Sequence, residues 1–164
     1  MKSLTRDELH NLLDAAKQVS RLDYLMLLVT FNHGLRVSET ISLSPANISG
    51  GHLVVQRLKK SRKTTQPLLG DEKELLDMSG IFFPIDRTTF WRRMHRYGSK
   101  AGIPAFKCHP HALKHAAGRL AYLGGMGIPE IQQYLGHVNG GNTMIYMAAS
   151  EEEACNAFAA AVGQ

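Results

Sequence analysis

Residues 21–31 form an almost uninterrupted apolar segment, and this segment constrains the fold more than any other. Its sequence, RLDYLMLLVTF, spreads apolar side chains around nearly the whole circumference of a helix. A helix of this kind is normally buried on all sides. The segment is too short to cross a membrane, which requires about 20 apolar residues. The sequence therefore predicts a globular domain in which other helices pack around this one.

Helical spacing of apolar residues recurs on both sides of this segment. Thr5 and Glu8 form a capping-box pattern, which predicts the start of an amphipathic helix over about 6–19. Turn residues and apolar spacing predict further helices over 36–43, 71–78, 88–101, 110–123, 129–135, 142–148 and 151–162.

Residues 47–69 are the one stretch with strand character. Gly50-Gly51 marks a turn, and β-prone residues occupy 52–56 and 64–69. The turn between these two strands is strongly basic and carries Arg57, Lys59, Lys60, Arg62 and Lys63. We therefore expect a mainly α fold with a small antiparallel sheet (α+β), in a single domain over residues 1–164.

The net charge of +5 for 164 residues is unevenly distributed along the chain. Residues 1–56 are neutral overall, residues 57–119 carry fourteen basic and five acidic side chains, and residues 120–164 carry four glutamates and no lysine or arginine. A basic middle segment favours a surface that binds a polyanion, although a solvated charged face is the simpler alternative. Candidate phosphate contacts outside the hairpin are Arg87, Arg92, Arg93, Arg96 and Lys100.

The cysteines and histidines give little support for a metal site. Cys108 and Cys155 form no CxxC pair, which favours a reduced, cytoplasmic protein. A zinc site on His109, His111 and His115 is a weak alternative, because no cysteine or carboxylate stands at ligand spacing. We expect no metal and no cofactor.

Three short segments contain candidate anion-binding or catalytic side chains. His111, Lys114 and His115 share one face at a helix start, where an anion can bind, although ordinary polar surface residues would show the same spacing. Arg36, in Gly34-Leu-Arg36-Val-Ser-Glu39, can either reach a phosphate or form an ion pair with Glu39. His137 follows Leu135-Gly136, and Tyr146 comes nine residues later. Taken alone, these two positions suggest a turn residue and a core tyrosine.

Taken together and in this order, the segments resemble the tyrosine recombinase (phage integrase) family over nearly the whole chain. The family pattern combines G-L-R-x-x-E, a hairpin lysine, H-x-x-R-H, L-G-H and a tyrosine. The resemblance implies the catalytic-domain fold of that family and a catalytic set of Arg36, Lys59, His111, Lys114, His137 and Tyr146. Lys60 and Lys63 remain alternatives to Lys59 for the hairpin lysine.

The resemblance also implies a mechanism. Tyr146 attacks a DNA phosphate and forms a 3′-phosphotyrosine, while the hairpin lysine protonates the leaving 5′-oxygen. His111 acts as a general base toward Tyr146 or donates a hydrogen bond to the phosphate. Arg36, Lys114 and His137 would stabilise the charge that develops on the phosphate. Neither metal nor ATP is required in this scheme.

Two departures from the family pattern stand out. Lys114 replaces the usual arginine, which keeps the charge but loses the bidentate fork. We favour a working variant, because every other position is filled; the alternative is a catalytically weakened DNA-binding relative. The N-terminal DNA-clamping domain usual in the family also has no counterpart here, so we expect an isolated catalytic domain or a naturally short recombinase.

The expected partners follow from the resemblance. They are double-stranded DNA and further copies of the chain, as a dimer or tetramer, with no membrane. The terminal helix over 151–162 either packs on a neighbouring protomer or stays intramolecular. A helix-turn-helix regulator formed by 129–148 is disfavoured, because that stretch has no lysine or arginine. A cytoplasmic, nucleoid-associated protein of prokaryotic or phage origin is expected.

Overall fold

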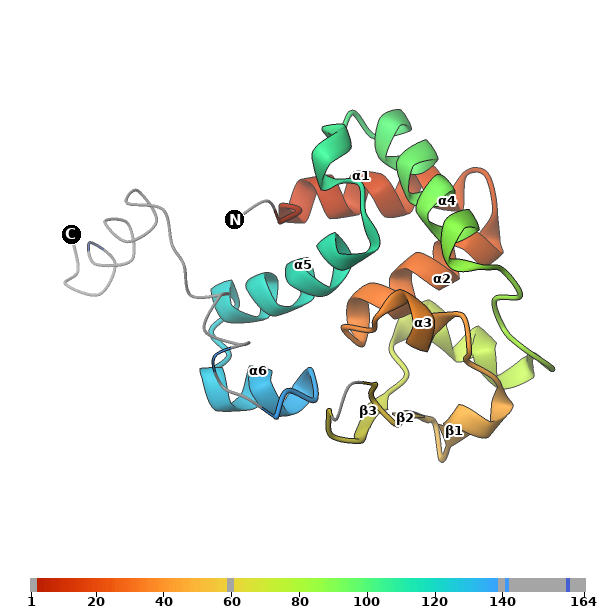
Figure 1. Cartoon of the computed structure of the whole chain (residues 1–164), viewed down its shortest axis with the longest axis vertical. Coiled ribbons are helices and arrows are strands. Elements are labelled where there is room, and N and C mark those ends of the chain that lie inside the picture. Colours follow the sequence, from red (N-terminus) through yellow and green to blue (C-terminus); the bar gives the residue numbers. More distant parts are fainter. Residues whose placement is uncertain (1–2, 59–60, 139–140, 142–158, 160–164) are drawn as a thin grey trace.

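The computed structural model describes residues 3–58, 61–138, 141 and 159. It confirms a mostly helical fold with one small antiparallel sheet (Figure 1). The elements, in chain order, are α1 (Arg6–Lys17), α2 (Arg21–Asn32), α3 (Val37–Thr40), η1 (Pro45–Asn47), β1 (Ile48–Ser49), β2 (His52–Val55), β3 (Thr64–Pro67), η2 (Gly70–Asp77), α4 (Arg87–Lys100), η3 (Ala105–Lys107), α5 (Pro110–Leu123) and α6 (Ile128–Tyr134).

The apolar segment predicted to be central forms α2, which packs against α1, α3, α5 and η2. Leu25, Leu27 and Val29 on this helix are almost fully buried. Asp23 is the unexpected member of this buried helix. Its carboxylate accepts hydrogen bonds from Tyr97 and Arg93 of α4, so that the buried charge is paired rather than isolated.

Helix α5 lies across the middle of the molecule in Figure 1 and contacts α1, α2, α4 and α6. It begins at Pro110, where the lack of an N–H group has no cost because the first N–H groups of a helix have no intrahelical partner. It runs to Leu123, as the sequence predicts. Because α5 touches both the N-terminal helices and α6, its inward face can bring residues distant in sequence together.

The three strands form a sheet in the order β1-β2-β3, with antiparallel neighbours. In the β2–β3 hairpin, Val55 lies opposite Thr64. The loop after β2 turns toward the end of α6, where the Arg62 N–H donates to the Gly136 carbonyl oxygen at 3.0 Å. This contact, together with the packing of α6 on β3, ties the hairpin to the segment that carries His137.

The helix predicted over 71–78 is a 3-10 helix, η2, rather than an α-helix. Glu72 is fully buried in this segment and accepts hydrogen bonds from Asn32 and from the Leu69 backbone N–H, at 2.9 and 2.8 Å. His33 lies 3.0 Å from the same carboxylate. These tertiary contacts hold the segment, and local helical spacing did not reveal them.

Several expectations concern residues outside the described part of the chain. They are Lys59, Lys60, Tyr146, the helix over 142–148 and the terminal helix over 151–162. Among the described residues, none of the helices has the length and apolarity needed to cross a membrane.

Candidate active site

Two glycine turns position the candidate site. Helix α2 ends with Gly34 at φ 56°, and the N–H groups of Gly34 and Leu35 donate to the carbonyls of Phe31 and Thr30. Helix α6 ends in the same manner, with Gly136 at φ 68°. This arrangement is the Schellman motif, in which glycine adopts a left-handed conformation without steric cost. Arg36 and His137 each follow directly from one of these turns.

The two turns also pack against other parts of the site, and only glycine leaves the necessary space. A Cβ atom on Gly34 would lie 2.2 Å from Leu135 Cδ2. A Cβ atom on Gly136 would lie 2.9 Å from both Arg57 Cγ and the Arg62 carbonyl oxygen. The glycines therefore allow the end of α2, the end of α6 and the β2–β3 hairpin to meet at one place.

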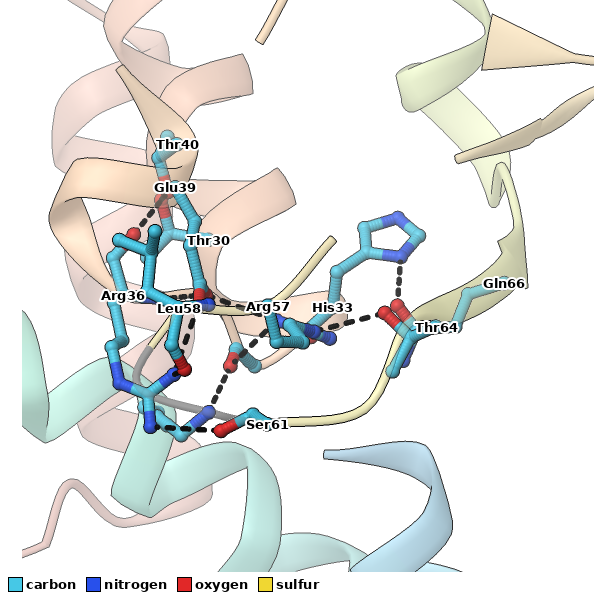
Figure 2. A network of polar contacts seen from close by, with 12 residues as sticks. Thr30, His33, Arg36, Glu39, Thr40, Arg57, Leu58, Ser61, Thr64 and Gln66 are labelled. Atoms are coloured by element: carbon cyan, nitrogen blue, oxygen red, sulfur yellow. Dashed lines mark hydrogen bonds and ion pairs between the residues drawn. The ribbon is translucent and has the colours of Figure 1, made fainter. Parts of the chain in front are cut away.

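Arg36 and Glu39 form an ion pair where the end of α2, the end of α6 and the hairpin meet (Figure 2). The Arg36 guanidinium donates to Glu39 Oε1 at 3.0 Å and to the Leu58 carbonyl oxygen at 3.2 Å. The ion pair left open by the sequence is thus present, while 21% of the Arg36 side chain remains exposed. Arg36 can therefore be fixed by Glu39 and still reach an external anion.

Glu39 is buried, with only 1% of its side chain exposed. Burial by itself raises the pKa of this carboxyl. The backbone N–H groups of Arg36 and Leu58 and the charge of Arg57 outweigh that effect, so that the pKa falls below its ordinary value. Glu39 is therefore an anion that organises the cations around it.

Arg57 differs from its expected role as an exposed phosphate contact. Its guanidinium has 0% exposure and donates to the carbonyl oxygens of His33 and Gly34, to Thr64 Oγ1 and to Glu39 (Figure 2). Five basic residues in one turn suggested a solvated surface, but the first of them faces inward. A buried guanidinium that makes four hydrogen bonds within the fold is not available to a DNA phosphate, so Arg57 does not belong to the proposed DNA contacts.

Lys114 lies on the inward face of α5 and is 7% exposed. Its ammonium group donates to the Gly34 carbonyl oxygen at 2.7 Å, across 80 positions of sequence. Burial, reinforced by the neighbouring Arg57 and Arg36 charges and opposed by Glu39, lowers the pKa of Lys114 to about 7. The helix face expected to carry His111, Lys114 and His115 is thus divided: Lys114 is buried, His115 is partly buried and His111 is exposed.

His137 is 5% exposed at the end of α6. Burial, together with the charges of Lys114, Arg36 and Arg57, lowers the pKa of its imidazole to about 4. At neutral pH the ring is therefore uncharged and can donate a single N–H to a phosphate oxygen. The turn before Arg36 packs against Leu135, and the turn before His137 packs against Arg57. Both Arg57 and Lys114 donate to the Gly34 carbonyl oxygen. The structure therefore brings Arg36, Lys114 and His137 together.

His111 occupies the first turn of α5, beside a cavity of about 370 Å³. Val37, Arg87, Trp91 and Pro110 also line this cavity, and Trp91 is 47% exposed. The cavity connects the start of α4 with the start of α5. His111 is thus accessible from the same side as the basic residue that opens α4.

Most of the predicted DNA contacts are exposed. These are Arg62, Lys63, Arg87, Arg92, Arg96 and Lys100. Arg93 differs, because it forms an ion pair with Asp23 and is 31% exposed. Its charge is already partnered within the fold, which makes it a weaker candidate than its neighbours on α4.

Two functional features were not assigned from the sequence. Glu39 was named only as part of a motif, yet it organises Arg36 and Arg57. The Gly34 carbonyl oxygen accepts hydrogen bonds from both Arg57 and Lys114, and no side-chain pattern signals such a role. The zinc alternative gains no support, since in the described part of the chain no three His, Cys, Asp or Glu side chains form a metal-binding group.

Comparison with known proteins places this arrangement in a family. The family model described as the phage integrase family matches residues 2–79 and 82–153. The type 1 fimbriae regulatory protein FimB of Escherichia coli (strain K12) is 32% identical over 171 residues, covering 90% of this chain and 84% of FimB. The tyrosine recombinase XerD of Haemophilus ducreyi is 32% identical over 169 residues, covering 88% of this chain. The chain belongs to the phage integrase family.

The chain spans 57% of the length of that XerD relative. Among solved structures, XerA recombinase superposes with a TM-score of 0.79 at 24% identity, over 95% of this chain and 63% of that one. The catalytic domain of bacteriophage HP1 integrase superposes with a TM-score of 0.69 at 23% identity, over 95% of this chain and 94% of that one. A lambda integrase tetramer bound to a Holliday junction gives a TM-score of 0.70 at 23% identity, over 88% of this chain and 47% of that one. These superpositions establish the catalytic-domain fold.

Proposed function

We propose that the chain is the catalytic domain of a site-specific DNA recombinase that breaks and rejoins strands through a 3′-phosphotyrosine at Tyr146. The observation that supports this most strongly is the convergence of Arg36, Lys114 and His137 on one place. They come from three segments separated by up to about a hundred residues. Such a set provides preorganised donors for a phosphate.

The proposed reaction balances without an external energy source. The Tyr146 oxygen forms a bond to phosphorus while the bond from phosphorus to the 5′-oxygen breaks. The Tyr146 proton passes to His111, and Lys59 gives a proton to the leaving 5′-oxygen, with Lys60 or Lys63 as alternatives. The covalent intermediate conserves the phosphodiester energy, so the reverse attack by a 5′-hydroxyl rejoins the strand.

The other residues would stabilise the charge that develops on the phosphate oxygens. Arg36 has an exposed edge for this purpose and is held from behind by Glu39. Neutral His137 would donate a hydrogen bond to a phosphate oxygen, and the buried Lys114 would supply a positive point charge from the interior side of the site. A phosphate entering the site favours the protonated form of Lys114, because opposite charges stabilise each other at short distance.

We further propose that Lys114 is a working substitute for the arginine usual in the family. Its ammonium group is anchored by the Gly34 carbonyl and thus has a fixed position. A lysine fixed in this way replaces the charge of an arginine but not its second hydrogen bond. The catalytically weakened relative is the competing hypothesis, and Lys114→Arg should raise the cleavage rate if the missing fork limits the reaction.

The proposed substrate is double-stranded DNA. The exposed basic residues of the hairpin and of α4 would contact its phosphates, which position a protein without reading sequence. Recombination joins two DNA sites, so we expect several copies of the chain to assemble on them, as a dimer or tetramer. Such a protein would act in the cytoplasm, at the nucleoid.

A suicide substrate tests this function. The DNA is a duplex nicked next to the cleavage position, drawn from a random-sequence pool enriched for binding to the protein. Loss of the short 5′-hydroxyl fragment prevents religation, so covalent protein–DNA adduct accumulates. We expect adduct with the unmodified chain and none with Tyr146→Phe. If the chain binds the DNA and forms no adduct, it is a binding protein and the proposal fails.

A further inference from the structure

Arg57 occupies a position at which most of the family motifs meet. Nη2 donates to the His33 carbonyl oxygen at 2.6 Å, and Nη1 donates to the Gly34 carbonyl oxygen at 3.2 Å, which together engage the end of α2. Nε donates to Thr64 Oγ1 at 2.9 Å, so that Arg57 also bridges the two ends of the basic hairpin loop. One side chain thus joins the glycine turn before Arg36 to the loop that carries the candidate general acid.

The same side chain reaches the other two parts of the site. Nη1 lies 3.3 Å from Glu39 Oε2, while the opposite oxygen of Glu39 holds Arg36. The Arg57 stem packs against the α6 turn, because a Cβ atom on Gly136 would lie 2.9 Å from Arg57 Cγ. Any displacement of Arg57 would therefore be felt both at Arg36 and at the turn before His137.

Arg57 and Lys114 are further linked through a shared acceptor. Both donate to the Gly34 carbonyl oxygen, Lys114 at 2.7 Å and Arg57 at 3.2 Å. Two cations on one carbonyl repel each other, and Glu39 offsets part of that repulsion. A carbonyl held from one side by a rigid guanidinium gives the flexible lysine a fixed anchor.

We propose that Arg57 is a buried positioning residue that joins the hairpin, the Arg36 turn and the His137 turn and holds the anchor of Lys114. It makes no contact with DNA. Its role is to keep the phosphate-binding donors in register, and this inference rests on the proposed recombinase function. This role explains how the site can remain ordered with a lysine at position 114. The planar guanidinium of Arg57 lies behind Lys114 and fixes the Gly34 carbonyl oxygen to which Lys114 donates.

The test compares two substitutions of Arg57 with a matched control on the same hairpin. Arg57→Lys keeps the charge and loses the fork, and Arg57→Met loses both. Arg62→Met removes an exposed charge from the same loop. Each variant is assayed for adduct formation on the nicked duplex, for the salt dependence of DNA binding, and for the pH profile of cleavage at sub-saturating protein.

Arg57→Lys should lower the cleavage rate by about 10- to 100-fold, since a displacement of reacting groups by about 1 Å has effects of this order. Arg57→Met should lower it further and shift the limb of the pH profile set by Lys114 to higher pH, because a neighbouring cation has gone. Arg36, Glu39, His115 and His137 also face Lys114, and both variants retain these four residues. Neither Arg57 variant should alter the salt slope, whereas Arg62→Met should reduce its magnitude by about 0.9.

Two results would overturn the proposal. One is a wild-type cleavage rate for Arg57→Lys. The other is a log–log salt slope of DNA binding whose magnitude falls by about 0.9 in Arg57→Met, the change expected when one phosphate contact is lost. That result would make Arg57 a phosphate ligand. If Arg57→Met does not fold, Thr64→Val replaces it, because this variant removes one Arg57 partner without changing any charge. Thr64→Val should lower the cleavage rate, and wild-type cleavage in Arg57→Lys still contradicts the inference. Absence of adduct in the unmodified chain would instead refute the proposed function.

Discussion

The burial of the Lys114 ammonium group leads us to a quantitative prediction about the free energy of unfolding. An unfolded lysine has a pKa of 10.5, and in the folded protein burial and nearby cations lower it to about 7. Each pKa unit corresponds to about 1.4 kcal/mol, so the charged form destabilises the fold by at most about 5 kcal/mol. Lys114→Met has similar volume and no charge, and should therefore unfold at higher denaturant concentration than the unmodified protein at pH 6.

The sign of the pH dependence follows from proton linkage. Below pH 7 Lys114 is charged in both states, and the full destabilisation is present. As the pH rises from about 7 toward 10.5, the folded protein has lost the proton and the unfolded chain still binds it, so the unmodified protein gains stability relative to Lys114→Met. Between pH 6 and pH 9 the difference in unfolding free energy between the two proteins should shrink by about 2–3 kcal/mol.

Urea unfolding of both proteins at pH 6, 7, 8 and 9 measures this difference, and other titrating groups largely cancel in the comparison. Gly34 keeps one donor in the variant, because Arg57 still contacts its carbonyl oxygen. A stability difference that does not change with pH would show that Lys114 titrates normally. In that case the burial and the crowding of cations described for the site would be wrong.

Three further predictions concern the turn before His137, the DNA surface and the first helix. Gly136→Ala should destabilise the fold by about 1–3 kcal/mol because of its left-handed φ and crowded surroundings, with Gly125→Ala, at φ 94° but in open space, as the control in urea unfolding. DNA binding should show a log–log salt slope of roughly −4 to −5 if about five of the exposed basic residues contact phosphates, and filter binding that is insensitive to salt would contradict the basic surface. Thr5→Ala should cost about 1 kcal/mol of unfolding free energy through loss of the capping box, and Thr5→Ser, which retains a capping oxygen, should not.

Local signals in the sequence predicted much of the fold. The capping box of Thr5 and Glu8 is present, with Thr5 accepting from the Glu8 N–H and Glu8 from the Thr5 N–H. The start of α5 at Pro110 and the helix-ending glycine after α6 also follow the prediction. These features depend on residues three or four positions apart, so a sequence pattern contains the information they require.

Burial of charged residues was not predictable in the same way. Arg57 opens a strongly basic turn, and Lys114 is expected to share a helix face with two histidines. Both patterns favour exposure, yet both side chains face inward. Their burial depends on Glu39 and on a backbone carbonyl of Gly34, and these groups are brought near only by the packing of α5 and the hairpin on α2. The order of side chains in the sequence does not show which backbone carbonyl will accept a hydrogen bond, or which distant carboxylate will compensate a buried charge.

The covalent intermediate offers the most direct test of the central claim. The chain is incubated with the nicked duplex, digested with nuclease and protease, and analysed by mass spectrometry. We expect one modified peptide, with a nucleotide 3′-phosphate attached to Tyr146, and a free 5′-hydroxyl on the released strand. A nucleotide on another residue, or a released strand that carries a 5′-phosphate, would contradict the central claim.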